Sequence, residues 1–477
     1  MVIIVLTKFS VGNYRLAAAL YLFLVYALGV FFKSAWSDDY SSLLDPEGLR
    51  VHAIKDGRLL HGASIDFFYS HFTTVQSLTF IRMFGLAGLI LLNDLLLRKF
   101  LKIESSIAVA VASTVAFTLP SFQFSAHWAG AFGFAWTAYL AILGFTLFNE
   151  NSKLKKFLGY LVFVLSLFAY PLMSFFIFPF IYALWLIRGV SIKILFRDLA
   201  VGIFLFVSGA AISFAITAFY LNVKGLIFND RVALVAVDDI PSKIVFFFTR
   251  PFALTYRPFL IDSPTLSSLL LTLIVFSSFL VFLFWQKWKS LLAVSTHILT
   301  LNVFFIASLL PLLVTSDNQI DMRLVSSNTW LYCFVVVFLF LRLQKTIGSK
   351  VEFFKFKSQV ITVSFLIIVG FLTINQNFWN LYHEPFQDKQ RFFQEQFSAC
   401  TDTQIQSGVE IIRRTLPWPH KNLIGAYSQS TDLESEWVPV SAVIQYLKDT
   451  NTKIVTPPIL VEANTNPGAC VVSLDEY

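Results

Sequence analysis

Residues 157–187 read FLGYLVFVLSLFAYPLMSFFIFPFIYALWLI and contain no Asp, Glu, Lys or Arg. As a single helix this stretch would be about 46 Å long at a rise of 1.5 Å per residue. The hydrocarbon core of a bilayer is only ~30 Å thick. Pro171 lies in the middle of the stretch, and proline interrupts the hydrogen-bond ladder of a helix. The stretch therefore predicts two short membrane-spanning helices, 157–170 and 171–187.

The rest of the chain has the same apolar character. Hydrophobic residues make up 56% and charged residues 14%, against roughly 25% charged residues in soluble domains. Apolar runs long enough to cross a bilayer predict about eleven spans. These are 14–32, 75–97, 105–119, 128–148, 157–170, 171–187, 199–220, 265–285, 290–314, 327–341 and 359–376. We therefore expect an all-α polytopic membrane protein.

Basic residues between the predicted spans test this arrangement. They form five clusters, at 98–102, 153–156, 188–197, 287–289 and 342–357. With two helices in 157–187, all five clusters fall on one side of the membrane. With one helix, the first two clusters would lie on the opposite side from the last three. Cytoplasmic loops carry an excess of Lys and Arg, so the two-helix interpretation is favoured. It predicts a cytoplasmic N-terminus, two long outside loops at 33–74 and 221–264, and an outside C-terminus.

The charge of the chain divides it into two parts. Residues 377–477 hold seven Lys or Arg against twelve Asp or Glu, a net charge of −5. Since the whole chain has a net charge of +7, residues 1–376 have a net charge of +12. The basic part is the membrane part, and the sequence pI of 9.1 is therefore no argument for nucleic-acid binding. We expect a membrane domain at 1–376 and a small outside domain at 377–477.

The residues after 377 have the pattern of a small α/β domain. Helical periodicity covers 387–416 and 438–448, and strands are expected at 422–427 and 453–461. Cys400 and Cys470 both lie in this domain, and an outside location is oxidising. A Cys400–Cys470 disulfide is predicted, with two free thiols as the alternative.

The first outside loop begins with the paired carboxylates Asp38 and Asp39, where the first span ends. Adjacent carboxylates repel one another, so one has a raised pKa and suits a general base, or both bind a divalent cation. The alternative is the solvated polar end of a helix. A short surface helix is expected at 46–56. Asp56, Arg58 and His61 follow it, and we take them as candidate substrate-binding residues.

Arginines that lie near the outer surface are candidates for binding a phosphate, because the guanidinium fork matches a phosphate bidentately. Arg82 lies about two turns into the second predicted span, where it either binds a phosphate or pairs with Asp38 or Asp39. Asp94, near the other end of that span, is expected to pair with Arg98. The later outside loops contribute Arg250, Arg257 and Arg323. For Arg250 and Arg257, anchoring to lipid headgroups is the alternative.

Three short motifs resemble one known family. They are Asp38-Asp39-Tyr40 after the first span, Asp56-Gly57-Arg58-Leu59-Leu60 after a surface helix, and the turn at Tyr170-Pro171. The chain resembles the type II serotype-converting glucosyltransferases that modify bacterial O-antigen, within the broader GT-C class of polytopic glycosyltransferases. That family usually has Tyr-Gln where this chain has Tyr170-Pro171. The resemblance covers about a third of the chain.

The resemblance implies an inverting glycosyltransferase of the bacterial inner membrane. Its donor would be a sugar, glucose by this resemblance, linked to polyprenyl phosphate. Its acceptor would be a surface glycan such as the O-antigen of lipopolysaccharide. Asp38 or Asp39 would act as the base. Two alternatives stay open at this point. One is a flippase or polymerase of lipid-linked glycans, and the other is a non-enzymatic membrane assembly protein.

Overall fold

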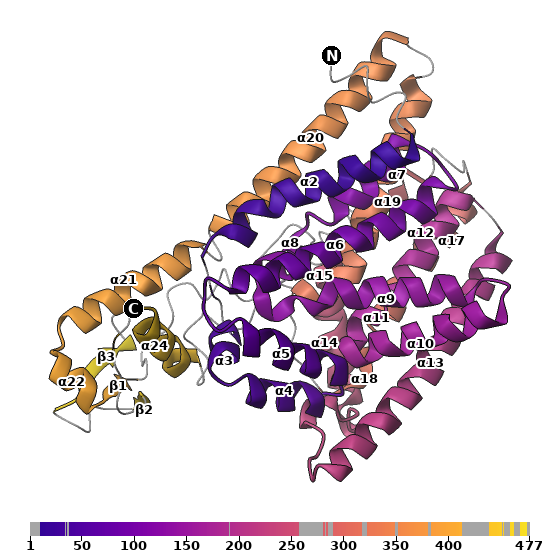
Figure 1. The fold of residues 1–477 in the computed structure, drawn as a ribbon. Coiled ribbons are helices and arrows are strands. Elements are labelled where there is room, and N and C mark those ends of the chain that lie inside the picture. Colours follow the sequence, from indigo (N-terminus) through magenta and orange to yellow (C-terminus); the bar gives the residue numbers. More distant parts are fainter. Residues whose placement is uncertain are drawn as a thin grey trace.

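The computed structural model describes residues 10–33, 35, 38–189, 191–256, 280–281, 283–284, 290–316, 322–348, 352–379, 383–412, 438–450, 452, 458–461 and 468–474. Within these residues the protein is mostly helical, with a small sheet near the C-terminal end (Figure 1). Long helices pack side by side in a bundle, and the sheet lies in a smaller body at one end of it (Figure 1).

Eight helical segments of the described residues are long and apolar enough to cross a membrane. They are α2 (Val11–Phe31), α6 (Leu78–Leu101), η2 with α9 (Ala129–Phe148), α11 with α12 (Pro171–Arg188), α13 (Ile192–Val223), α17 (Leu291–Ser308), and most of α19 (Ser326–Gly348) and α20 (Glu352–Phe378). A ninth span results if α7 (Ile107–Ala116) and α8 (Pro120–His127), which meet at a bend of 66°, count as one. The chain is thus a helical, multi-pass membrane protein.

The described residues hold eight or nine such spans, against the eleven or so that the sequence predicts. The expected span 105–119 contains α7, a helix of 10 residues, and Pro120 begins α8 just beyond it. The expected span 157–170 is present as α10 (Lys153–Ala169), a helix of 17 residues that is not among the eight above. Most of the expected span 265–285 lies outside the described residues.

The chain reverses its direction between α10 and α11, as the sequence predicts. Tyr170 has extended backbone angles, with φ −153° and ψ 93°, and the proline after it begins α11. The Tyr170 ring lies against Arg58 of the first outside loop. At the opposite end of the bundle, Lys155 and Arg188 both lie within electrostatic reach of Lys99. We call the end that carries Arg58 the outer end, and the opposite end the inner end.

Three short helices cover the outer end, namely α3 (Asp38–Leu44), α4 (Pro46–Lys55) and α5 (Leu59–His71). Helix α4 begins where the Asp45 carboxylate accepts the N–H of Gly48 at 2.8 Å, and Pro46 suits its first position. Gly57 has φ +82°, which a residue without a Cβ adopts at no steric cost, and it turns the chain into α5. The predicted short helix at 46–56 is therefore present as α4.

The second outside loop is held between α4 and the outer end of α18 (Leu310–Val314). It contains η3 (Asp230–Val232), η4 (Val237–Asp239), α14 (Ile240–Thr249) and α15 (Pro251–Thr255), and η5 (Met322–Val325) follows α18. Asn229 donates its N–H to the Lys55 carbonyl at 3.1 Å, and Val235 donates to the Val314 carbonyl at 3.0 Å. Hydrogen bonds on both sides thus fix the backbone of this loop.

The C-terminal domain has a parallel three-stranded sheet in the order β2-β1-β3. Its elements are α21 (Glu384–Ser398), α22 (Asp402–Ser407), β1 (Val409–Ile412), α24 (Val438–Asp449), β2 (Ile459–Val461) and β3 (Cys470–Ser473). The helix expected at 438–448 is present, and β2 covers the last three residues of the strand expected at 453–461. The single helix expected at 387–416 is wrong, because α21 ends at Ser398 and Thr401 caps a separate α22. Beyond it, Gly408 at φ +139° ends α22, and Val409–Ile412 form β1. The strand expected at 422–427 lies outside the described residues.

Buried apolar side chains form two clusters. The larger cluster fills the helix bundle, and the other lies at the outer end. The second cluster contains Tyr40 and Leu43 of α3 together with Phe393 of α21 and Leu447 of α24. The C-terminal domain and the first outside loop therefore share one hydrophobic core, and α24 packs against α3 (Figure 1).

Candidate active site at the outer end

Asp39 is buried at the start of α3, where it is only 1% exposed. Its Oδ1 accepts the N–H of Gly130 at 2.9 Å and the hydroxyl of Tyr69 at 3.4 Å. These donors come from η2 (Ala129–Ala131) and α5, so the carboxylate joins three elements. Asp38 begins the same helix, and its side chain lies outside the described residues. Asp39 is thus a fixed carboxylate that anchors the helix carrying both members of the pair.

Arg82 lies under this helix and is also 1% exposed. Its Nη2 donates to the carbonyl of Phe32, at the end of α2, at 3.0 Å. The guanidinium is within electrostatic reach of the Asp39 carboxylate. A buried charge is tolerated when it is paired and hydrogen-bonded. Its burial leaves the guanidinium little access to a phosphate, and its pairing with Asp38 or Asp39 stays a prediction.

Asp56 joins the two long outside loops. Its side chain is fully buried, and its Oδ1 accepts the Nδ2–H of Asn229 at 2.7 Å. Two cationic or titratable groups approach the other oxygen, with Arg58 Nη2 at 3.6 Å and His52 Nε2 at 3.8 Å. A buried carboxylate with an amide donor and a guanidinium nearby is electrostatically satisfied. Asp56 therefore fixes the position of Arg58.

The Arg58 side chain links Asp56 to Tyr170, which is distant in the sequence. Its guanidinium carbon lies 4.3 Å from the ring centroid of Tyr170, in a cation–π contact. The Arg58 side chain is 24% exposed, so it is oriented by its neighbours and still reaches the surface. Among the sequence-predicted arginines with described side chains, Arg58 best combines a fixed orientation with access for a phosphate.

His61 is buried beside Arg58 and faces the same segment as Asp39. Its ring centroid is 5.4 Å from that of Phe132, and a Cβ on Gly133 would lie 3.2 Å from its Nδ1. Burial, with the nearby charge of Arg58 second, lowers the pKa of His61 to about 3. The imidazole is therefore neutral at physiological pH, and it suits a hydrogen-bonding role rather than that of a cation.

The segment 129–134 brings these groups together. Gly130 binds Asp39, Phe132 packs against His61, and the ring of Phe134 lies 4.3 Å from that of Tyr170. Asp39, Arg58 and Tyr170 belong to the three motifs on which the family resemblance rests. The fold thus gathers the three motifs at the outer end, although they are far apart in the sequence.

The three later arginines are placed less completely. Arg250 is exposed and caps the start of α15. Arg323 lies in η5, which packs against α15, but its side chain is outside the described part of the chain. Arg257 falls wholly outside it. The structure therefore places the backbones that carry Arg250 and Arg323 near one another and does not place Arg257.

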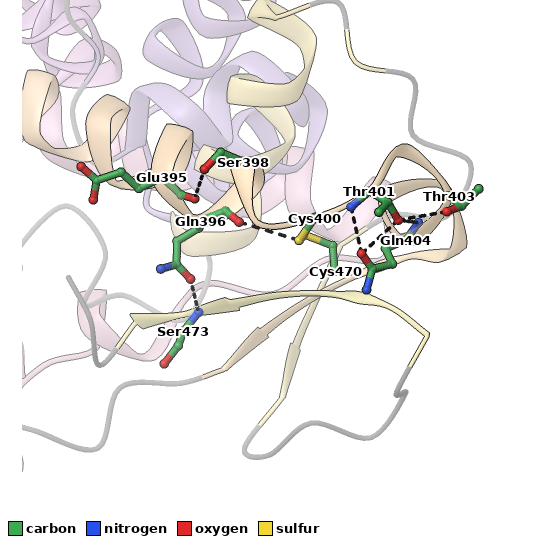
Figure 2. Close-up of a disulfide and its surroundings, with 9 residues drawn as sticks. All are labelled: Glu395, Gln396, Ser398, Cys400, Thr401, Thr403, Gln404, Cys470 and Ser473. Carbon is green, nitrogen blue, oxygen red and sulfur yellow. Dashed lines mark hydrogen bonds between the residues drawn. A yellow bond between two sulfur atoms is a disulfide. The ribbon is translucent and has the colours of Figure 1, made fainter.

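Cys400 and Cys470 form the disulfide that the sequence predicts, with their Cα atoms 5.6 Å apart. Figure 2 shows that it joins the chain just after α21 to the start of β3. A second link lies nearby, where the N–H of Ser473 in β3 donates to Gln396 Oε1 in α21 at 3.1 Å. The sheet and α21 are thus tied together by one covalent bond and one hydrogen bond.

Several residues at this end were not singled out from the sequence. Tyr69, Gly130 and Asn229 are the hydrogen-bond partners of Asp39 and Asp56, and Lys389 of the C-terminal domain is buried against Tyr40. None of them lies in a recognisable motif. Only Lys389 could have been noticed in the sequence, because it is a lysine on the inward face of an amphipathic helix.

Paired carboxylates also suggested a divalent cation. In the part of the chain that the structure describes, no three His, Cys, Asp or Glu side chains are grouped as metal ligands. The Asp39 Oδ1 is already bound by Gly130 and Tyr69. A cation at the Asp pair would therefore depend on Asp38, whose side chain is outside this description.

Comparison with known proteins adds no family to this account. No family model matches the chain, and no curated protein is significantly similar to it. The assignment of a function therefore depends on the geometry of the outer end and on the motifs described above.

Proposed function

We propose that this protein is a membrane glycosyltransferase that uses a sugar linked to polyprenyl phosphate. The observation that carries the proposal is the meeting of the three motifs, since Asp39, Arg58 and Tyr170 all contact the segment 129–134 or one another. A carboxylate pair and an oriented arginine at a membrane surface suit transfer from a lipid-borne donor. The acceptor would be a surface glycan such as O-antigen, and the sugar glucose, as the resemblance implies.

The proposed reaction inverts the configuration at the anomeric carbon. The Asp38 carboxylate takes the proton of an acceptor hydroxyl, whose oxygen attacks the anomeric carbon. The bond between that carbon and the phosphate oxygen breaks, and its electron pair leaves with the polyprenyl phosphate. Arg58 stabilises the charge of the departing phosphate. Asp39 is bound by Gly130 and Tyr69, so we give it the role of positioning α3 and give the base role to Asp38.

The topology of the proposal follows from the reaction. A lipid-linked donor is presented at the outer face, so the outer end would face the periplasm of a bacterial inner membrane. The basic clusters at the inner end, including Lys99, Lys155 and Arg188, would then face the cytoplasm, in keeping with the excess of Lys and Arg in cytoplasmic loops. The N-terminus would be cytoplasmic, and the C-terminal domain periplasmic.

The test is sugar transfer by the purified protein in nanodiscs, with polyprenyl-phosphate glucose as donor and O-antigen as acceptor. Asp38→Asn is expected to lower kcat by about 10²- to 10⁴-fold, the usual contribution of a general base. Asp39→Asn should lower it through the position of α3, with a loss of thermal stability. Asp66→Asn, an exposed carboxylate on α5, is the matched control and should keep full activity.

Full activity in both Asp38→Asn and Asp39→Asn would contradict the proposal. So would a wild-type protein that leaves all lipid-linked sugars unchanged. In that case, comparing the surface glycans of cells with and without the protein would separate a flippase or polymerase from an assembly protein.

A further inference from the structure

The C-terminal domain contacts the helix that begins with the Asp pair. Helix α24 packs against α3, and Tyr40 and Leu43 of α3 share a hydrophobic core with α21 and α24. At the edge of this contact, Lys33 Nζ lies 3.1 Å from Asp449 Oδ2. A domain that merely displayed a binding surface for a partner would have no need of such a contact with α3.

One charged residue lies in the middle of this contact. Lys389 of α21 is fully buried, and its Nζ lies 4.2 Å from the centroid of the Tyr40 ring and 6.0 Å from that of Phe386. Taking an ammonium group out of water is unfavourable, and a hydrophobic residue of similar size would often be as stable there. By contrast, Arg391 on the same helix is exposed and pairs with Asp388. Burial between the two parts of the protein therefore distinguishes Lys389 from the exposed charge on the same helix.

The charge of Lys389 acts on a residue two positions after the candidate base Asp38. Tyr40 follows Asp38 and Asp39 directly in the sequence, and its ring is 1% exposed. A cation over the face of an aromatic ring fixes the ring in place. Since α3 is a helix of only seven residues, fixing Tyr40 fixes the orientation of the turn that carries both carboxylates.

We propose that Lys389 is a positioning residue of the outer site, and that the C-terminal domain is a structural part of this site. Lys389 holds Tyr40, and Tyr40 sets the orientation of α3 and hence of Asp38. The Cys400–Cys470 disulfide and the bond from Ser473 to Gln396 hold α21 on the sheet, which keeps Lys389 in its place. This inference rests on the proposed function for its catalytic consequence, but its structural part is independent.

The test compares three variants in nanodiscs. Lys389→Met keeps the length of the side chain and removes its charge, Lys389→Arg keeps the charge, and Arg391→Met removes an exposed charge from the same helix. We expect Lys389→Met to lower kcat about tenfold, equivalent to ~1.4 kcal/mol, with the donor KM little changed. Lys389→Arg should restore most of kcat, and Arg391→Met should match the wild type.

Hydrogen exchange of the α3 amides gives a readout that needs no sugar transfer. The amides of residues 41–44 should exchange about tenfold faster in Lys389→Met than in wild type or Arg391→Met. Wild-type protection of the β1 and β3 amides in the same experiment shows that the domain is still folded. If the wild type transfers no sugar, the proposed function fails, while the exchange rates still decide the role of Lys389. The inference would be overturned if Lys389→Met had the kcat and the α3 exchange rates of the wild type. It would also be overturned if Lys389→Arg lost as much kcat as Lys389→Met.

Discussion

Helix α6 carries an arginine near each end, and the two lie in different surroundings. At the outer end, Arg82 is 1% exposed and lies beside the buried Asp39. At the inner end, the Arg98 side chain is 58% exposed and binds Asp94 at 2.7 Å. One end of this helix thus carries a buried arginine near a buried carboxylate, and the other end carries a hydrated ion pair.

The difference has an energetic meaning. Exposed ion pairs contribute about 0–1 kcal/mol to stability, so the inner pair is of the kind found on ordinary protein surfaces. A buried pair is unfavourable to desolvate, and breaking it leaves an uncompensated charge that costs about 3–5 kcal/mol. Charges kept inside a membrane domain usually belong to functional sites. The contrast therefore favours the outer end as the functional site that we propose.

The largest expected effect comes from the same substitution at the two ends of α6. Arg82→Met leaves the Asp39 carboxylate buried without its cation, and we expect a loss of about 3–5 kcal/mol in the free energy of unfolding. Arg98→Met removes a hydrated partner and should cost less than about 1 kcal/mol. Unfolding by SDS in mixed micelles measures both. Equal losses would show that burial does not distinguish the two ends.

The sequence predicted contacts between residues close together in the chain better than contacts between residues far apart. Asp94 and Arg98 are four residues apart on one helix, and their pairing follows from helix geometry. Charge counting and Pro171 likewise predicted the reversal between α10 and α11. The hydrogen bond from Asn229 to Asp56 joins positions 173 residues apart, and no local pattern indicates it.

The C-terminal domain shows the same limit. Its helix at 438–448 was predicted from periodicity, and the disulfide from an oxidising location, because both depend on local pattern or on compartment. The sequence did not predict that the helix ends at residue 407, because the helical pattern of polar residues continues past Gly408. The burial of Lys389 against Tyr40 depends on how the domain docks onto α3, which a single sequence does not specify.

A smaller effect is expected from pH at the outer end. The pKa of His61 is about 3 in the folded protein, below the value of ~6.5 in an unfolded chain. Between these values the unfolded chain binds a proton that the folded one does not, so stability falls as the pH is lowered. The loss attributable to His61 is about 1.4 kcal/mol for each pH unit below about 6.5.

His61→Gln removes this proton-binding difference and should reduce the decline in stability between pH 7 and pH 5.5. His71→Gln is the matched control, because His71 is exposed at the end of the same helix, and its decline should match that of the wild type. The measurement is the midpoint of SDS unfolding at each pH. An unchanged slope in His61→Gln would mean that the imidazole is hydrated and that the outer end is wetter than the structure shows.

The smallest expected effect is at the inner end. Asp94 accepts hydrogen bonds from Arg98 Nε at 2.8 Å and from Arg15 Nη2 at 3.1 Å, so it links α6 to α2. Asp94→Asn keeps the shape and removes the charge, and we expect a loss of about 1 kcal/mol or less at low salt. In 1 M salt the Debye length is ~3 Å, and this loss should largely vanish. The loss in Arg82→Met should persist there, because salt does not screen a buried pair. A salt-independent loss in Asp94→Asn would place both ends of α6 in the same environment, and burial would then no longer single out the outer end as the site.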